Sequence, residues 1–111
     1  MRLFVSYARQ DNHVDRLTSI HELLKAVGQP YVDDLHHSEE SSRNVSVMKA
    51  LYFADVFVAV HTPNYMRTPW TQLEVGLAER WGLRLLVLLP GDKLRASSYE
   101  QLDFSVGSSN T

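Results

Sequence analysis

Three runs of consecutive apolar residues, and one shorter segment that follows a proline, predict β-strands along this chain. They occupy residues 2–7, 56–61 and 83–90, with the shorter segment at 30–34. Strand-forming residues dominate them. The runs at 56–61 and 83–90 are almost uninterrupted, as is typical of strands that are covered on both faces.

Three other stretches carry apolar residues at helical spacing, at 11–28, 45–54 and 68–81. In the first stretch, Asp11 or Asn12 is expected to cap the helix N-terminus, and Gly28 to follow its C-terminus. The apolar positions of the second stretch are Val45, Met48 and Leu51, together with Tyr52.

The third helical stretch opens at Pro69 and places one carboxylate beside an indole. On a helical wheel, a single apolar stripe contains Trp70, Leu73, Leu77 and Trp81. Glu74 lies at the edge of this stripe, one turn after Trp70. A carboxylate there is poorly solvated, which makes it a candidate functional group. The structural alternative is a boundary carboxylate whose head reaches water or pairs with Arg67 or Arg80.

Strands that alternate with helices predict right-handed βαβ units, and hence an α/β fold. We expect a small doubly wound sheet of five strands, mainly parallel and with a weak fifth strand, that carries helices on both faces. Residues 1–90 should form its core, while residues 91–111 add a weak helix around 97–102, a weak strand near Phe104 and a flexible tail. Ligands bind such sheets beyond the carboxyl ends of the strands, where the strand order reverses. The candidate residues at these ends are Ser6, Tyr7, Arg9, Asp33 and Asp34.

Composition narrows the function further. The 111 residues are 44% hydrophobic and 22% charged, with a net charge of −2, which suits one ordinary globular domain and disfavours a nucleic-acid surface. The sequence contains no cysteine, so thiol nucleophiles, thiolate metal sites and disulfides are excluded. No apolar run approaches the roughly 20 residues of a membrane span, and no signal peptide is expected. We therefore expect a cytoplasmic protein that binds neither membrane nor nucleic acid.

Several common catalytic patterns are missing from the sequence. The segment after the first strand, "SYARQD", has no glycine, so neither a dinucleotide fingerprint nor a P-loop is present. The adjacent His36 and His37 lack the spacing of a metal site, and we expect no metal. Ser6 lacks the glycine elbow of a serine hydrolase. Glu74 remains, and a carboxylate of this kind stabilises the cationic transition state of glycoside cleavage, while an indole stacks on a flat leaving group.

Two segments resemble the signature sequences of TIR (Toll/interleukin-1 receptor) domains. "LFVSYARQD" is similar to the family's first box, and "VFVAVHTPNYMRTPWTQLEVGLA" to its third-strand segment, in which Trp precedes Glu by four residues. The resemblance covers about 90 residues, through Pro90. It implies a flavodoxin-like strand order of 2-1-3-4-5 and, in an NAD⁺-cleaving branch common in bacteria, an essential glutamate.

The resemblance also implies roles for individual residues. Glu74 matches the essential glutamate and Trp70 its aromatic neighbour. The residues after the first strand, Tyr7, Ala8 and Arg9, match positions that contact the nicotinamide end of the substrate. Asp33 or Asp34 matches the acid after the second strand. The family's assembly and gating loop corresponds to residues 35–43, which include Leu35, His36, His37, Ser38, Glu39, Glu40 and Arg43.

The function that this implies is cleavage of NAD⁺, as substrate rather than cofactor, to nicotinamide and either ADP-ribose or a cyclic isomer. A stand-alone domain of this size resembles bacterial antiviral-defence proteins that make such a signal for a separate effector. The family's enzymes form homo-oligomers through TIR–TIR contacts. Two alternatives remain open: a non-catalytic TIR interaction module, and an enzyme like the nucleoside deoxyribosyltransferases, which also use a glutamate at an anomeric carbon.

Overall fold

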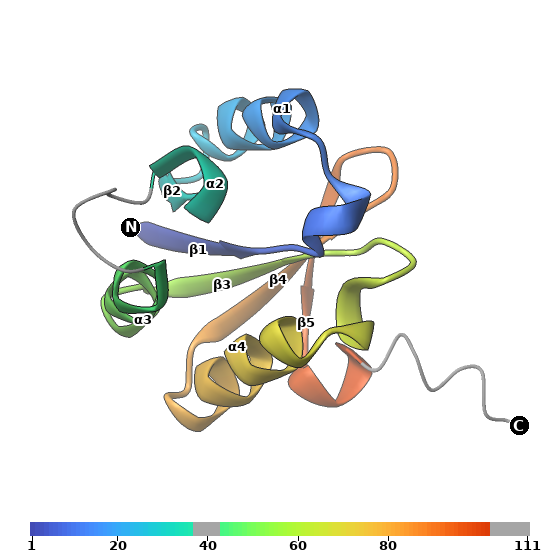
Figure 1. Ribbon diagram of the computed structural model, residues 1–111. Coiled ribbons are helices and arrows are strands. Elements are labelled where there is room, and N and C mark those ends of the chain that lie inside the picture. The colour runs from blue at the N-terminus through green and yellow to red at the C-terminus, as the bar shows by residue number, and fades with distance from the viewer. Residues whose placement is uncertain (37–42, 103–111) are drawn as a thin grey trace, which may run out of the picture.

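The computed structural model describes residues 1–36 and 43–102. These residues form a five-stranded sheet and the helices packed against it (Figure 1). Its strands are β1 (Arg2–Ser6), β2 (Gln29–Tyr31), β3 (Val56–Val60), β4 (Arg84–Leu89) and β5 (Lys93–Ser97). Their order in the sheet is β2-β1-β3-β4-β5, with the first four strands parallel and β5 antiparallel to β4. The expected doubly wound, mainly parallel α/β fold is confirmed.

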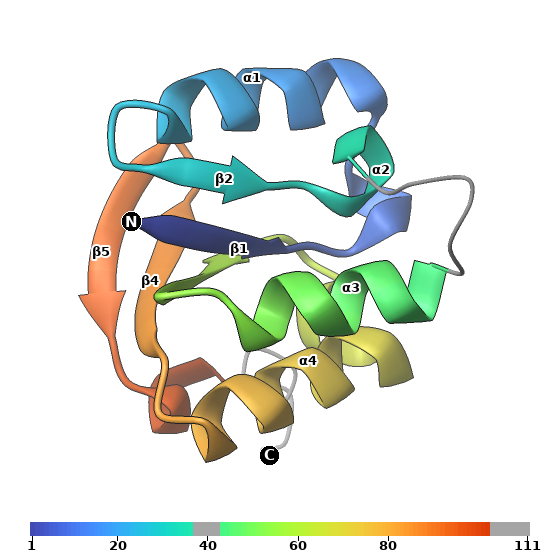
Figure 2. The same cartoon turned by 90° about the vertical axis from the view of Figure 1, so that its left-hand side faces the viewer.

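Helices cover both faces of this sheet, as Figures 1 and 2 show. Helix α1 (Val14–Leu24) lies on one face with the short α2 (Asp33–His36) beside it, and α3 (Arg43–Tyr52) and α4 (Pro69–Arg80) lie on the other. Three 3₁₀ turns complete the described structure: η1 (Arg9–Asp11), η2 (Tyr65–Arg67) and η3 (Tyr99–Leu102).

The sheet separates two apolar cores because successive strand residues point to opposite faces. Leu3 and Val5 of β1 pack in the cluster under α1, while Phe4 between them packs in the cluster under α3 and α4. All five residues of β3 are buried, which confirms that this strand is covered on both faces.

The boundaries of α1 differ from the sequence prediction. His13 is the N-cap, without a side-chain hydrogen bond. Of the two expected caps, Asp11 accepts hydrogen bonds from the backbone and side chain of Asn64, and Asn12 donates to the Ala8 carbonyl. The helix ends at Leu24, and Gly28 packs against the N-terminus of β1. A Cβ atom at Gly28 would lie 2.4 Å from the carbonyl oxygen of Met1, so close packing requires glycine here.

The buried faces of α3 and α4 also differ from the prediction. In α4 the buried residues are Thr71, Glu74, Val75 and Ala78, while Leu73 and Trp81 of the expected stripe are 48% and 39% exposed. The face toward the sheet is thus rotated by about one residue, roughly 100°. In α3 Val47 and Leu51 are buried, whereas Val45, Met48 and Tyr52 are exposed. Trp81, at the C-terminal end of α4, lies beside α3, where it contacts Tyr52 edge-on.

Two segments near the sheet edges have other structures than expected. The second strand stops at Tyr31, so Asp33 and Asp34 open α2 instead of ending the strand. Residues 93–97 form β5, paired in register with β4, where only weak structure was expected. The expected helix around 97–102 is the 3₁₀ turn η3, and the expected strand near Phe104 lies outside the described residues. The division of the chain at residue 90 stays a prediction.

Candidate active site

The carboxyl ends of β1 and β3 meet the start of α4 at the point where the strand order reverses. β1 pairs with β2 on one side and with β3 on the other. The chain therefore adds β2 on one side of β1 and the later strands on the other side. Thr68 caps α4 by accepting a hydrogen bond from the Thr71 backbone N–H. Pro69 occupies the first turn, where a backbone N–H has no partner within the helix, so its missing N–H costs nothing. This start places Glu74, one turn further on, above the end of β1.

Glu74 is held there by a line of buried hydrogen bonds. The hydroxyl of Ser6, at the end of β1, donates to Glu74 Oε1 over 2.7 Å, and the phenol of Tyr65 donates to Ser6 Oγ over 2.7 Å. Glu74 is only 5% exposed. Thr71 donates to the Tyr65 carbonyl oxygen and so fastens η2 to α4. The structural alternative, in which the Glu74 head reaches water or pairs with Arg67 or Arg80, differs from this arrangement, because the carboxyl is buried and accepts a hydrogen bond from Ser6.

Burial raises the pKa of Glu74 to about 8, from an ordinary value of 4.5. Desolvation is the main cause, and the negative charge of Asp33 adds to it, while hydrogen bonds from Ser6 and Trp70 act in the opposite direction. A carboxyl group with this pKa can change its charge near neutral pH, as general acids, bases and charge stabilisers in active sites do.

A second polar cluster faces Glu74 from the α2 side. Arg43 Nη1 lies 2.8 Å from Asp34 and 3.0 Å from Asp33, and Arg9 Nη2 lies 3.0 Å from Asp34. The Tyr7 hydroxyl donates to Asp34 over 2.6 Å. Three separate elements, η1, α2 and α3, are therefore tied together by charge.

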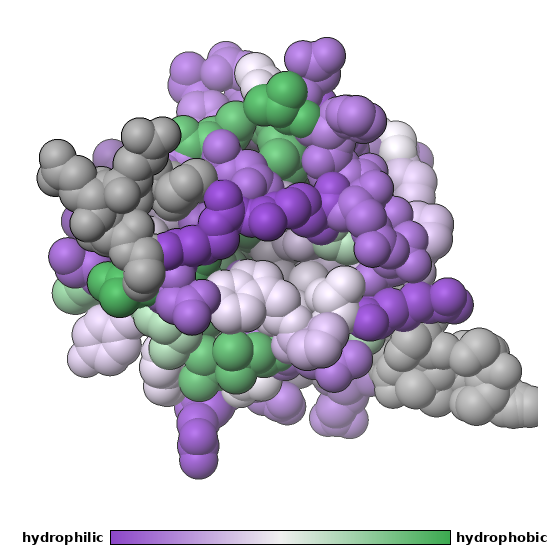
Figure 3. Space-filling view, in the orientation of Figure 1, coloured by the Kyte–Doolittle hydropathy of each residue, from purple (hydrophilic) through white to green (hydrophobic). Residues whose placement is uncertain are grey.

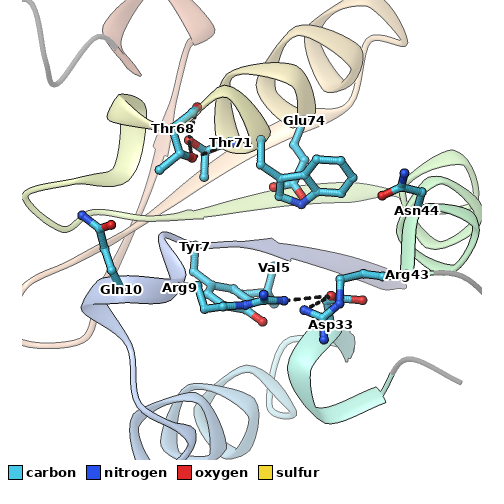
Figure 4. Close-up of a pocket in the computed structure, with 11 residues that line it drawn as sticks. Val5, Tyr7, Arg9, Gln10, Asp33, Arg43, Asn44, Thr68, Thr71 and Glu74 are labelled. Carbon is cyan, nitrogen blue, oxygen red and sulfur yellow. Dashed lines mark hydrogen bonds and ion pairs between the residues drawn. The ribbon is translucent and has the colours of Figure 1, made fainter. Parts of the chain in front are cut away.

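Between Glu74 and this cluster lies a cavity of about 310 Å³. Glu74, Thr68 and Thr71 border it from α4 and its cap, and Tyr7, Arg9, Asp33 and Arg43 lie opposite (Figure 4). The Trp70 side chain also lines it. Figure 3, which has the orientation of Figure 1, shows a band of hydrophilic side chains across the surface above paler residues, with a recess between them. Cation, carboxylate and indole thus surround one space of small-molecule size.

The structure brings most of the predicted site residues together. Glu74, Trp70, Tyr7, Arg9 and Asp33 line the cavity. Asp34 lies one contact further out, paired with Arg9 and Arg43, and Ser6 lies behind Glu74 at 1% exposure.

The residues assigned to the assembly loop have several positions. Leu35 is half-buried against the core under α1, and His36 accepts a hydrogen bond from the Val32 backbone N–H and contacts the His21 ring. Arg43 lines the cavity at the first residue of α3. His37, Ser38, Glu39 and Glu40 lie outside the described residues.

Sequence reasoning gave no role to three polar residues that contribute to the site. Tyr65 stands in the loop segment "TPNYM", where a tyrosine two residues after a proline could have suggested a buried anchor. Gln10 and Asn44 line the cavity from η1 and α3 but carry no pattern that would mark them.

Within residues 1–36 and 43–102, no three His, Asp or Glu side chains gather closely enough to hold a metal ion. In the same part of the chain, each helix is too short or too polar to cross a bilayer.

Comparisons with known proteins agree with the fold. The sequence model of the TIR domain matches residues 3–110. Among solved structures, the chain is similar to the TIR domains of the activated Roq1 resistosome, which directly recognises the pathogen effector XopQ. The TM-score is 0.65 and the identity 20%, over 79% of this chain and 56% of that one, so this chain spans little more than half of its length.

A second similar structure is a 2-deoxyribosyltransferase from the psychrotolerant bacterium Bacillus psychrosaccharolyticus. Its TM-score is 0.61 and its identity 16%, over 81% of this chain and 73% of that one. At these identities both structures show a shared fold and nothing finer. Comparison with curated proteins gave no match.

Proposed function

Because this chain belongs to the TIR domain family, we propose that it cleaves the bond between nicotinamide and ribose in NAD⁺. The observation that carries the proposal is the buried carboxyl of Glu74, which lines a cavity. The indole of Trp70, one turn earlier on α4, lines the same cavity. Burial of a carboxyl is unfavourable, so its presence at a cavity wall favours a chemical role over a structural one.

In the proposed reaction the C–N bond breaks and nicotinamide leaves with the bonding electron pair. The ribosyl group becomes cationic, and ionised Glu74 stabilises that charge in a site with little water. Water then attacks the anomeric carbon and loses a proton to solvent, which gives ADP-ribose. If an internal adenine nitrogen or ribose hydroxyl attacks instead, the product is a cyclic isomer. Such a product would act as an immune signal that a separate effector binds.

The cavity supports the position of the substrate at both ends of the bond. The Trp70 indole can stack on the flat nicotinamide ring, and Arg9 and Arg43 lie at the opposite wall, where the diphosphate would extend. The carboxylates of Asp33 and Asp34 pair with these two arginines, and the ion pairs fix the guanidinium groups at the cavity wall.

We further propose that the domain self-associates, through the segment Leu35–Arg43 and neighbouring helix faces. Exposed apolar side chains on α3 and at the end of α4 support this part of the proposal. They are Val45, Met48, Tyr52 and Trp81. An apolar surface of this kind suits contact with another protein.

Nicotinamide release from NAD⁺ tests the proposed reaction directly. We expect release by the wild-type chain and a loss of at least a hundredfold in Glu74→Gln, because removal of a group that stabilises transition-state charge commonly costs about 10²–10³ in rate. Glu79→Gln, an exposed carboxylate on the same helix, is the matched control and should retain activity. Release by Glu74→Gln within threefold of wild type would contradict the assignment.

A parallel incubation with deoxyadenosine and a free base separates the alternatives. Base exchange without nicotinamide release would indicate a deoxyribosyltransferase. Inactivity on both substrates over a wide range of protein concentration would indicate a non-catalytic TIR module.

A further inference from the structure

Behind Glu74, on the side away from the cavity, lies the hydrogen-bonded line of Tyr65, Ser6 and Glu74. The three side chains come from η2, β1 and α4, and their residues are 0%, 1% and 5% exposed. Both oxygen–oxygen distances are 2.7 Å. A buried polar group costs free energy unless it is paired, and here each group pairs with the next.

The direction of this line follows from the chemistry of its outer member. Burial raises the pKa of the Tyr65 phenol well above its ordinary value, so the phenol stays protonated and donates. Ser6 has a single hydroxyl proton. With one lone pair occupied by Tyr65, its proton points to Glu74 Oε1.

We propose that Tyr65 and Ser6 are positioning residues that orient the Glu74 carboxyl toward the cavity and favour its ionised form. A carboxylate that accepts a hydrogen bond is stabilised relative to the protonated acid, and a hydroxyl that is itself a hydrogen-bond acceptor becomes a stronger donor. Tyr65 therefore acts on Glu74 through Ser6, without contact to the substrate. The effect on activity rests on the proposed function, but the effect on Glu74 does not.

Other titratable and charged groups surround Glu74 and stay unchanged in the test. They are Asp33 of α2, Tyr31 of β2, Tyr7 after β1, Arg9 of η1 and Arg43 of α3. Of these, Asp33 raises the pKa of Glu74 through its negative charge, and Glu74 in turn raises the pKa of Tyr31. A difference in the pKa of Glu74 between the wild-type chain and a variant at Tyr65 or Ser6 therefore reports the contribution of the hydrogen-bonded line.

Tyr65→Phe removes the phenol oxygen and keeps the buried ring. Ser6 then loses its donor, its hydroxyl can rotate, and its hydrogen bond to Glu74 weakens. We expect the pKa of Glu74 to rise by about half a unit to one unit, which lowers its ionised fraction at pH 7 roughly threefold to tenfold. Tyr99→Phe is the matched control, because the Tyr99 hydroxyl donates over 2.7 Å to the Leu83 carbonyl, away from the cavity.

Carbon NMR of chains labelled at the glutamate carboxyl carbon measures this effect without any assay of activity. The Glu74 signal is identified by its absence in Glu74→Gln. Its titration midpoint is then compared in the wild-type chain, Tyr65→Phe and Tyr99→Phe. We expect a higher midpoint in Tyr65→Phe and an unchanged one in Tyr99→Phe. A midpoint in folded Tyr65→Phe that equals the wild-type value would overturn the proposal. If Tyr65→Phe does not fold, Ser6→Ala serves the same measurement, since it removes the hydroxyl that donates to Glu74 and should also raise the midpoint.

The pH profile of nicotinamide release adds the functional readout. We expect the acid limb of kcat/KM to move to higher pH in Tyr65→Phe, with recovery toward the wild-type rate at alkaline pH. A shifted NMR midpoint in a chain that releases no nicotinamide would leave the line established and refute the proposed function. A uniform loss of rate at every pH, with an unshifted midpoint, would refute the line and leave the proposed function intact.

Discussion

Replacement of Glu74 by glutamine should stabilise the folded chain at neutral and alkaline pH, although it should abolish activity. Burial raises the pKa of Glu74 from 4.5 to about 8, so the folded chain binds this proton more tightly than the unfolded chain. Below pH 4.5 both states hold the proton, and the carboxyl brings no ionisation penalty. Stability is then lost progressively as the pH rises from there to about 8, because the unfolded state ionises first. Glutamine does not titrate and avoids this loss.

The size of the effect follows from the same shift. One pKa unit corresponds to about 1.4 kcal/mol, so the rise from 4.5 to about 8 sets a ceiling of roughly 5 kcal/mol above pH 8. At pH 7 the penalty is about 3 kcal/mol, and at pH 5 it is below about 1 kcal/mol. The glutamine amide can accept the Ser6 hydrogen bond, but its NH₂ group meets the Trp70 N–H, at a cost of about 1 kcal/mol that does not depend on pH.

Urea unfolding of both proteins at pH 5, 6, 7 and 8 measures the effect. The difference in unfolding free energy between Glu74→Gln and wild type should grow by about 3.5 kcal/mol in favour of glutamine over this range. Glu79→Gln, with its exposed side chain, should show no such trend. Parallel pH curves for Glu74→Gln and wild type would refute the reasoning, because they would mean that Glu74 has an ordinary pKa in the folded state.

Two further outcomes test the cavity and the assembly. Trp70→Ala should reduce nicotinamide release more than stability, since the half-buried indole lines the cavity; a loss of about 3–5 kcal/mol in unfolding, with activity that follows the folded fraction, would mean that Trp70 only packs in the core. Specific activity should rise with protein concentration over a hundredfold dilution series, because a neighbouring subunit would help to close the cavity. Constant specific activity, with light scattering that shows a monomer throughout, would contradict self-association.

The sheet could be predicted because its central strands are buried on both faces. Such strands read as unbroken apolar runs, and β3 and β4 are runs of this kind. β5 was missed because it is an edge strand in which exposed and half-buried positions mix, including the charged Lys93 and Arg95. The strand order came from the family resemblance, since apolar runs contain no information about which strands are neighbours.

The helix faces were harder to predict because bulk is a poor guide to burial on α3 and α4. The wheel of α4 assigns the largest apolar residues to the core, yet Leu73 and Trp81 lie outside while Thr71 and Ala78 lie against the sheet. Close approach of a helix to a sheet favours small side chains, and Trp81 instead forms a separate surface with exposed apolar residues of α3. Sequence reasoning nevertheless singled out Glu74 as a candidate, because it lies at the edge of the expected apolar stripe one turn after Trp70, and because it matches the family's glutamate four residues after a tryptophan.

The correct orientation of α4 strengthens the case for Glu74. An acid at the edge of an apolar stripe can extend its head into water, so its position there is compatible with a purely structural role. An acid in the centre of the buried face cannot do so, and it lowers the stability of the fold at neutral pH by several kcal/mol relative to a neutral side chain. A glutamine would accept the same hydrogen bond from Ser6 and avoid this loss, and the cost of about 1 kcal/mol where its NH₂ group meets the Trp70 N–H is smaller than the loss at neutral pH. Hydrogen bonding and packing therefore favour the amide, and what favours the carboxyl is a charge that can appear beside the cavity when a cationic group occupies it.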